Sequence, residues 1–126
     1  SYYIPNRFTE GYGINGAALQ QIAAEGCNLL VTVDCGIASV QTVAEMDEGM
    51  DIIITDHHLP GSTLPPAYAV INPHRADCTY PFKDLAGVGV AFKLVQALWQ
   101  MAEQRPYADD LDIAALGTIA DLVPLT

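Results

Sequence analysis

Three metal-competent side chains, Asp56, His57 and His58, directly follow the apolar run of residues 52–55 in the segment "DIIITDHHLP". Asp34 closes a second apolar run, "LLVTVD". In open parallel sheets, ligands bind beyond the carboxyl ends of the strands, so neighbouring strands would bring these two groups to one edge. Carboxylate and imidazole ligands together suit Mn²⁺, Fe²⁺ or Zn²⁺. The two strand ends therefore predict a metal site.

Each of these residues also has a structural explanation. Asp34 could cap the helix predicted to follow it. Adjacent histidines point in different directions, so one of His57 and His58 is expected to face the metal. The other would bind a second metal or a phosphate, or hold a ligand in place. Asp121 in "TIADLVP" is a third acidic candidate, although the sequence by itself favours a carboxylate that pairs with a basic group or faces solvent at a helix end.

Several residues could bind phosphate. Gly87 and Gly89 lie in "AGVGVAFK", at the expected start of a helix, where exposed N–H groups can receive an anion. The same glycines could instead allow close packing. Arg7 and Arg75 could clamp a phosphate or be merely exposed. The sequence contains no nucleophile elbow for acyl chemistry, so metal-assisted hydrolysis is favoured.

The elements that must position these residues follow from hydrophobic periodicity and from cap and turn residues. Three short apolar runs predict buried parallel strands, and a proline-rich connecting segment is expected over residues 60–81. The pattern predicts an α/β fold with a mainly parallel open sheet and flanking helices. The expected strands are residues 29–33, 52–55 and 69–71, and the expected helices are residues 15–25, 37–48, 87–104 and a last one from about 110 to before Pro124.

Composition limits the class of protein. The chain has 126 residues, of which 51% are hydrophobic and 16% charged, which suits one globular domain or part of one. No apolar run is long enough to span a bilayer, so no membrane association is expected. Three irregularly spaced cysteines favour a reducing, cytoplasmic location. The net charge of −10 argues against a broad nucleic-acid surface, unless bound cations reverse the local sign.

Four ordered segments resemble the DHH phosphoesterase superfamily. They are "YIPNRFTEGYGIN", "VTVDCGI" with "TDHH", "AVINPHRADCTYPFKDLAGVGVAFKL" and "ALGTIADLVPL". Within that superfamily they are similar to the bacterial exonucleases specific for single-stranded DNA. The resemblance implies a catalytic core with two Mn²⁺ or Mg²⁺ ions that degrades single-stranded DNA from its 5′ end in DNA repair and recombination. It also implies a single-strand-binding protein and a helicase as partners of the whole protein.

The resemblance assigns roles to individual residues. It implies a catalytic centre of Asp34, Asp56, His57, His58 and Asp121. Asp34 would bridge the metals, His57 and Asp121 would bind metal, and His58 would contact metal or phosphate. The segment that holds Arg7 is typical of this branch.

One departure from the family pattern affects the expected activity. The first family motif, Asp-x-Asp, is absent, because the only acids before Asp34 are Glu10 and Glu25. The C-terminal substrate-binding domain is missing too. Residues 1–126 are therefore expected to be a partial DHH catalytic domain that is inactive by itself. The alternatives are a relative acting on short oligonucleotides or nucleotide phosphates, and a non-catalytic replication scaffold.

Overall fold

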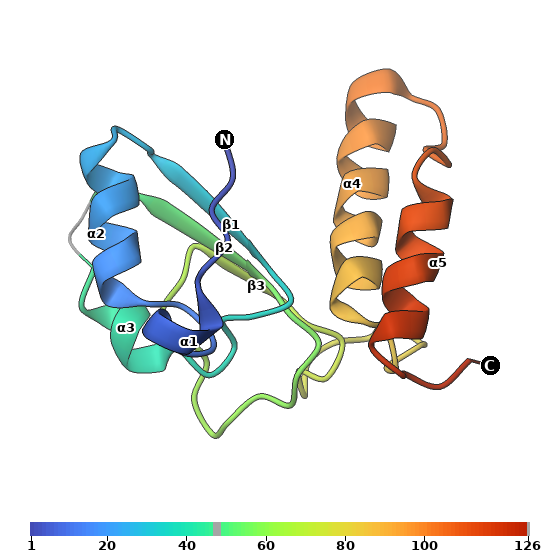
Figure 1. The fold of residues 1–126 in the computed structure, drawn as a ribbon. Coiled ribbons are helices and arrows are strands. Elements are labelled where there is room, and N and C mark those ends of the chain that lie inside the picture. Colours follow the sequence, from blue (N-terminus) through green and yellow to red (C-terminus); the bar gives the residue numbers. More distant parts are fainter. Residues whose placement is uncertain (47–48, 126) are drawn as a thin grey trace.

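The computed structural model describes residues 1–46 and 49–125, and of Arg7 it describes only the backbone. Helices and strands alternate along the first half of the chain, and two helices complete the second half (Figure 1). In chain order the elements are α1 (Arg7–Glu10), α2 (Gly16–Ala24), β1 (Leu29–Val33), α3 (Val40–Ala44), β2 (Asp51–Thr55), β3 (Ala69–Ile71), α4 (Gly87–Glu103) and α5 (Leu111–Ala120).

The strands form one parallel sheet in the order β1-β2-β3. Helices α2 and α3 lie on one side of this sheet, and the α4–α5 hairpin stands on the other (Figure 1). The predicted fold class is confirmed: the protein is α/β, with a parallel open sheet and flanking helices. All three predicted strands are present, because short apolar runs bounded by turn residues suit strands covered on both faces.

The core lies between the central strand and the first helical layer. Ile52 and Ile54 of β2 are buried against Leu19 of α2 and Val43 of α3. Strand periodicity sends alternate residues of β2 to the same face, which is why these two isoleucines share one core. The side chain of Asn15 caps α2 by accepting hydrogen bonds from two backbone N–H groups, as its position in the sequence predicts.

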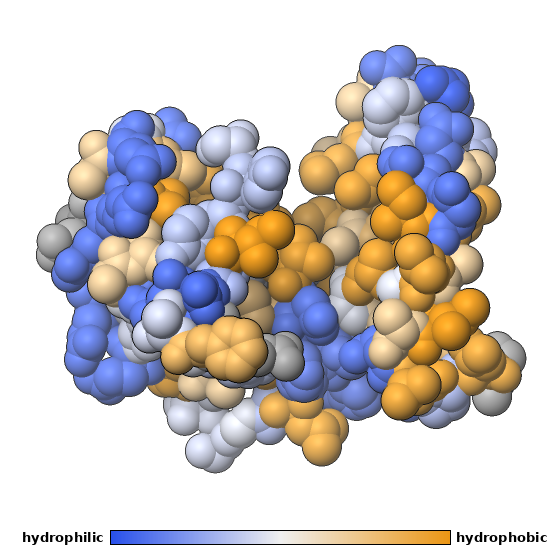
Figure 2. Space-filling model, viewed as in Figure 1, coloured by the Kyte–Doolittle hydropathy of each residue, from blue (hydrophilic) through white to orange (hydrophobic). Residues whose placement is uncertain are grey.

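Apolar side chains remain exposed on β1 and on the hairpin. Alternate residues of β1, Leu29, Val31 and Val33, are each about half exposed, and β1 pairs with a single strand among the described residues. Figure 2 shows further apolar side chains gathered over the lower half of the α4–α5 hairpin. None of the helices in the described part of the chain combines the length and apolar character that crossing a membrane requires.

The prediction of a helix over residues 37–48 is wrong at its start. The observed α3 begins at Val40, because Ser39, with a ψ of 42°, is outside the helical region and forms the N-cap. The backbone N–H of Ile37 donates instead to Oδ2 of Asp56 at 2.8 Å. Gly36 precedes it with a φ of 112°, which is outside the helical region. The helix also ends earlier than predicted, at Ala44 with Glu45 as its C-cap, and the last two residues of the predicted range, 47 and 48, lie outside the described residues.

Candidate metal centre

The ends of the three strands lie in one row across the sheet. Val33 pairs with Thr55, and Thr55 pairs with Ile71. The ladder continues one step further, because Asp34 N–H donates to Thr55 O at 3.0 Å and Asp56 N–H donates to Ile71 O at 3.1 Å. Polar groups that follow each strand are thereby placed at the same edge of the sheet, where α/β proteins bind their ligands.

His57 lies between two carboxylates that come from distant parts of the chain. Its Nε2 is 3.1 Å from Oδ1 of Asp34 and 3.3 Å from Oδ2 of Asp121. The same nitrogen is buried and has no hydrogen-bond partner within residues 1–46 and 49–125. The two oxygens are close to it without being aligned for a hydrogen bond. A buried polar atom in this state is uncommon in folded proteins and calls for an explanation.

A divalent cation fits this arrangement. Two ligand atoms at neighbouring corners of an octahedron, each about 2.1 Å from an ion, lie about 3 Å apart. The separations around Nε2 of His57 match that spacing. Asp34, His57 and His58 each also offer a ligand atom within 4.8 Å of the others. The mixture of carboxylate and imidazole suits a first-row ion such as Mn²⁺ better than Ca²⁺.

Asp34 is held in an unusual backbone conformation beside the start of α4. Its φ of 64° is left-handed, which aspartate tolerates better than most residues. A Cβ at Gly87 would lie 2.3 Å from Oδ1 of Asp34, so only glycine leaves room for this carboxylate. Partial burial raises the pKa of Asp34, while the nearby His57 opposes that rise and Asp121 adds to it. A bound cation would favour the charged form. Asp34 does not cap α3, whose N-cap residue is Ser39.

Asp121 reaches the cluster because α4 and α5 pack closely. It is the C-cap residue of α5. A Cβ at Gly117, one helical turn earlier, would lie 2.7 Å from Cγ1 of Val88 on α4. Gly117 thus lets the end of α5 approach the start of α4, where Gly87 adjoins Asp34. The hairpin therefore carries the third acidic group to the sheet edge.

Asp56 is a fully buried carboxylate that holds the turn together. Its Oδ1 accepts the backbone N–H of His57 at 2.8 Å and that of His58 at 3.2 Å, and it lies 2.6 Å from Nδ1 of His58. Its Oδ2 accepts the N–H of Ile37. Burial alone would raise the pKa of Asp56, but the hydrogen bonds from Ile37, from the ring of His58 and from both histidine N–H groups outweigh it and lower the pKa.

His58 is oriented by Asp56 on one side and by Tyr12 on the other. Because an ionised carboxylate can only accept, Nδ1 of His58 carries the hydrogen that faces Asp56. In the neutral ring, Nε2 then has a lone pair for a cation or a hydrogen-bond donor. It lies 3.2 Å from the hydroxyl of Tyr12, whose single hydrogen can be donated either to this Nε2 or to the carbonyl of Asp34, at 3.1 Å.

Three residues at this edge were not found by reasoning from the sequence: Tyr12, Asn72 and His74. Nδ2 of Asn72 donates to His58 O at 2.8 Å, and Nδ1 of His74 donates to His57 O at 2.7 Å. The position of Asn72 directly after the third predicted strand is a signal that could have found it. Tyr12 comes from the loop before α2, and nothing in the local sequence pattern points to it.

Arg75 and Gly89, two further phosphate-binding candidates, contact other groups. The guanidinium of Arg75 pairs with Asp77 at 2.6 Å and also donates to the carbonyl of Val70. Gly89 packs against the side chain of Leu85. The close-packing alternative thus accounts for Gly87 and Gly89, and phosphate binding by them stays a prediction. The side chain of Arg7 lies outside the description.

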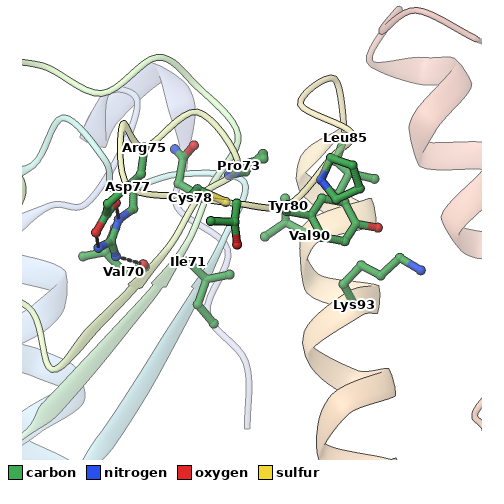
Figure 3. A pocket seen from close by; sticks show the side chains of 13 residues that line it. Val70, Ile71, Pro73, Arg75, Asp77, Cys78, Tyr80, Leu85, Val90 and Lys93 are labelled. Carbon is green, nitrogen blue, oxygen red and sulfur yellow. Dashed lines mark hydrogen bonds and ion pairs between the residues drawn. The ribbon is translucent and has the colours of Figure 1, made fainter.

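A pocket of about 670 Å³ opens between the segment after β3 and α4 (Figure 3). Arg75 lines it from the sheet side with its charge already matched by Asp77, and Lys93 belongs to its lining on α4 but points its ammonium group away from the sheet. Its lining includes Asn72, which also bonds to His58 O, but none of Asp34, His57, His58 and Asp121. The pocket is therefore next to the candidate metal centre and separate from it.

Comparisons with known proteins agree on one family. The model of the DHH family, N-terminal domain, matches residues 1–118. The chain is 53% identical to the single-stranded-DNA-specific exonuclease RecJ of Bacillus subtilis over 98% of its own length and 15% of that protein. It is 47% identical to the Escherichia coli RecJ over 98% of its own length and 24% of that protein. The chain thus spans about a sixth to a quarter of the length of these relatives.

Solved structures agree with the sequence relatives. The fold matches a crystal structure of exonuclease RecJ bound to manganese with a TM-score of 0.84 and 39% identity, over 98% of this chain and 31% of that one. It matches RecJ in complex with Mn²⁺ from Thermus thermophilus with a TM-score of 0.74 and 38% identity, over 89% of this chain and 17% of that one. By its sequence over residues 1–118 and by its fold, the chain belongs to the DHH family.

Proposed function

We propose that this chain supplies metal-binding residues to the catalytic centre of a 5′-to-3′ exonuclease that acts on single-stranded DNA. The observation that carries the proposal is the buried Nε2 of His57, which lies between the carboxylates of Asp34 and Asp121 and has no hydrogen-bond partner among the described residues. The names of the relatives, single-stranded-DNA-specific exonucleases, and the manganese in the similar structures support the choice of substrate and ion.

Each residue would have a distinct task. Asp34, His57 and Asp121 would hold the ion, and His58 would contact a second ion or the scissile phosphate. Asp56 would keep the hydrogen of His58 on Nδ1, which leaves Nε2 able to act as a ligand or acceptor. When bound, divalent ions supply a nucleophile at neutral pH and stabilise negative charge on the phosphoryl group.

We also infer that the chain is one part of a DHH catalytic domain, and that the rest of the protein supplies further metal-binding carboxylates and the surfaces that grip DNA. The net charge of −10 supports this inference, because DNA is bound mainly through basic side chains that neutralise its phosphates. The isolated chain would then have little or no activity. Mg²⁺ as an alternative ion, a role in DNA repair and recombination, and a single-strand-binding protein and a helicase as partners belong to the same proposal. A reducing, cytoplasmic location is consistent with three cysteines that form no disulfide.

A nuclease assay tests the proposal. The full-length protein that carries these residues is incubated with Mn²⁺ and single-stranded DNA labelled at either end, and His57→Ala is assayed beside it. We expect mononucleotides from the 5′ end in the wild type and a loss of about 100-fold or more in the variant. Gln21→Ala, on the exposed surface of α2 and away from the cluster, is the matched control and should keep full activity.

Two other outcomes would contradict the proposal. Cleavage restricted to very short oligonucleotides or nucleotide phosphates would identify a small-substrate phosphoesterase. Absence of cleavage of any substrate by a folded protein, with no difference in Mn²⁺ binding between the wild type and His57→Ala, would identify a non-catalytic scaffold.

A further inference from the structure

The two histidines of the cluster lie just beyond β2, where the sheet no longer supplies backbone partners. Their backbone N–H and C=O groups still need hydrogen bonds, because the sites of these bonds are partly buried. Both N–H groups donate to a single oxygen, Oδ1 of Asp56. Both carbonyls accept from side chains of the segment that follows β3. All four backbone groups are therefore held by side chains.

The carbonyl partners are themselves linked. Nδ1 of His74 donates to His57 O at 2.7 Å, and Nδ2 of Asn72 donates to His58 O at 2.8 Å. The free oxygen of the Asn72 amide, Oδ1, accepts the backbone N–H of His74 at 2.8 Å. Asn72 is 3% exposed, so its amide cannot exchange these partners for water at low cost. Asn72 and His74 thus form one hydrogen-bonded brace.

We propose that Asn72 and His74 are positioning residues that set the backbone of His57 and His58, and through it the imidazole of His57 against Asp34 and Asp121. This inference rests on the proposed metal-binding function of His57. The peptide group before His57 is fixed by Asp56, and the one after it is fixed by His74. With both fixed, the ring has little freedom to leave the two carboxylates.

His74 acts through His57 rather than as a ligand. Its Nδ1 must carry a hydrogen, because its partner is a carbonyl oxygen. With Nδ1 engaged at 2.7 Å by the carbonyl oxygen of His57, that nitrogen is not available to a cation. Substitution of residues that orient metal ligands typically weakens metal binding by about 10- to 100-fold.

A pair of amide substitutions isolates the proposed hydrogen bond. The amide nitrogen of asparagine can occupy the position of Nδ1, whereas that of glutamine reaches the position of Nε2. In the full-length protein we would compare His74→Asn, His74→Gln and His57→Ala, and measure Mn²⁺ affinity from the electron paramagnetic resonance signal of free Mn²⁺. Circular dichroism would check the fold of each variant. We expect His74→Gln to weaken Mn²⁺ binding by about 10-fold or more and His74→Asn to remain near the wild type.

Kinetics provide the readout that a purely structural role would not change. In His74→Gln, kcat on single-stranded DNA should fall while KM stays the same, and raising the Mn²⁺ concentration should restore part of kcat. Equal Mn²⁺ affinity in the wild type and in His74→Gln, with a loss in His57→Ala, would overturn the inference and leave the proposed function intact. Equal losses in His74→Asn and His74→Gln would also overturn it. Unchanged affinity in His57→Ala would instead contradict the proposed function itself.

Discussion

Gly87, the first residue of α4, adjoins the carboxylate of Asp34 so closely that a Cβ on it would lie 2.3 Å from Oδ1 and 2.5 Å from Cβ and Cγ of Asp34. The contact joins the start of the α4–α5 hairpin to the end of β1. The place of Gly87 in a glycine-rich segment predicts phosphate binding, and the structure shows that Gly87 leaves room for the side chain of Asp34.

Substitution of Gly87 by alanine should therefore displace Asp34. A shift of about 1 Å at a catalytic group can lower kcat/KM by about 100-fold, and we expect a loss of that order in the full-length protein. Gly16→Ala is the matched control, because Gly16 is also the first residue of a helix and its Cβ would meet only Cγ2 of Thr42, at 3.8 Å. If Gly87→Ala were as active as the control variant and the wild type, the contact between Gly87 and Asp34 would not matter for activity.

Gly117→Ala should separate α5 from α4. The added Cβ would lie 2.7 Å from Cγ1 of Val88, and overpacking of this kind costs about 1–3 kcal/mol. Thermal unfolding should show the loss of stability, and Mn²⁺ affinity should fall because Asp121 moves away from His57. The double variant Val88→Gly/Gly117→Ala removes all three close contacts with the added Cβ. It should recover most of the Mn²⁺ affinity, and failure to recover would show that Gly117 acts in another way.

Asp56→Asn should destabilise the protein although it preserves the shape of the side chain. An asparagine keeps one acceptor oxygen, so its NH₂ group must face either the N–H of Ile37 or the donors around His58. One buried donor then lacks a partner, at a cost of about 2–3 kcal/mol in the free energy of unfolding. Urea unfolding in the presence of EDTA measures this cost without any contribution from metal. A change within about 0.5 kcal/mol would contradict the role assigned to Asp56.

Mn²⁺ should stabilise the folded protein through His57. A ligand present at about 100 times its Kd adds about 2.7 kcal/mol to the free energy of unfolding. We expect Mn²⁺ to raise the melting temperature of the full-length wild type, EDTA to reverse the increase, and His57→Ala to show a much smaller response. An equal rise in the variant would mean that Mn²⁺ binds at some other place in the protein.

Much of the fold could be predicted from the sequence because its signals are local. The apolar runs of β1 and β2 and the long amphipathic pattern of α4 are each contained in one continuous segment. The acidic and histidine residues at strand ends were recognisable for the same reason, since topology alone brings the ends of neighbouring parallel strands together. For the candidate site, the structure shows that the predicted residues are close together: the carboxylates of Asp34 and Asp121 both lie beside Nε2 of His57.

What could not be predicted depends on contacts between distant segments. The start of α3 differs because Gly36 has a φ of 112° in a space closed by the distant side chains of Ile14 and Ile54, and the backbone becomes helical only after Ser39. The position of Asn72 after a predicted strand could have marked it as a residue of this edge, but the hydrogen bonds of Asn72 and His74 could not be predicted, because their partners are backbone carbonyls after β2. Gly87 and Gly117 can be understood only once the residues opposite them, Asp34 and Val88, are known.

The alignment of the strand ends in a single row makes the site sensitive to errors in strand pairing. Val33, Thr55 and Ile71 share that row. If β2 slipped by one residue against β1, His57 would move by about 3.3 Å along the sheet, and every side chain of β2 would turn to the opposite face. An ion whose ligands tolerate displacements of only a few tenths of an ångström would not bind to such a product. Metal binding would thus discriminate between a correctly and an incorrectly registered sheet, which would make the ion a checkpoint for folding as well as a cofactor.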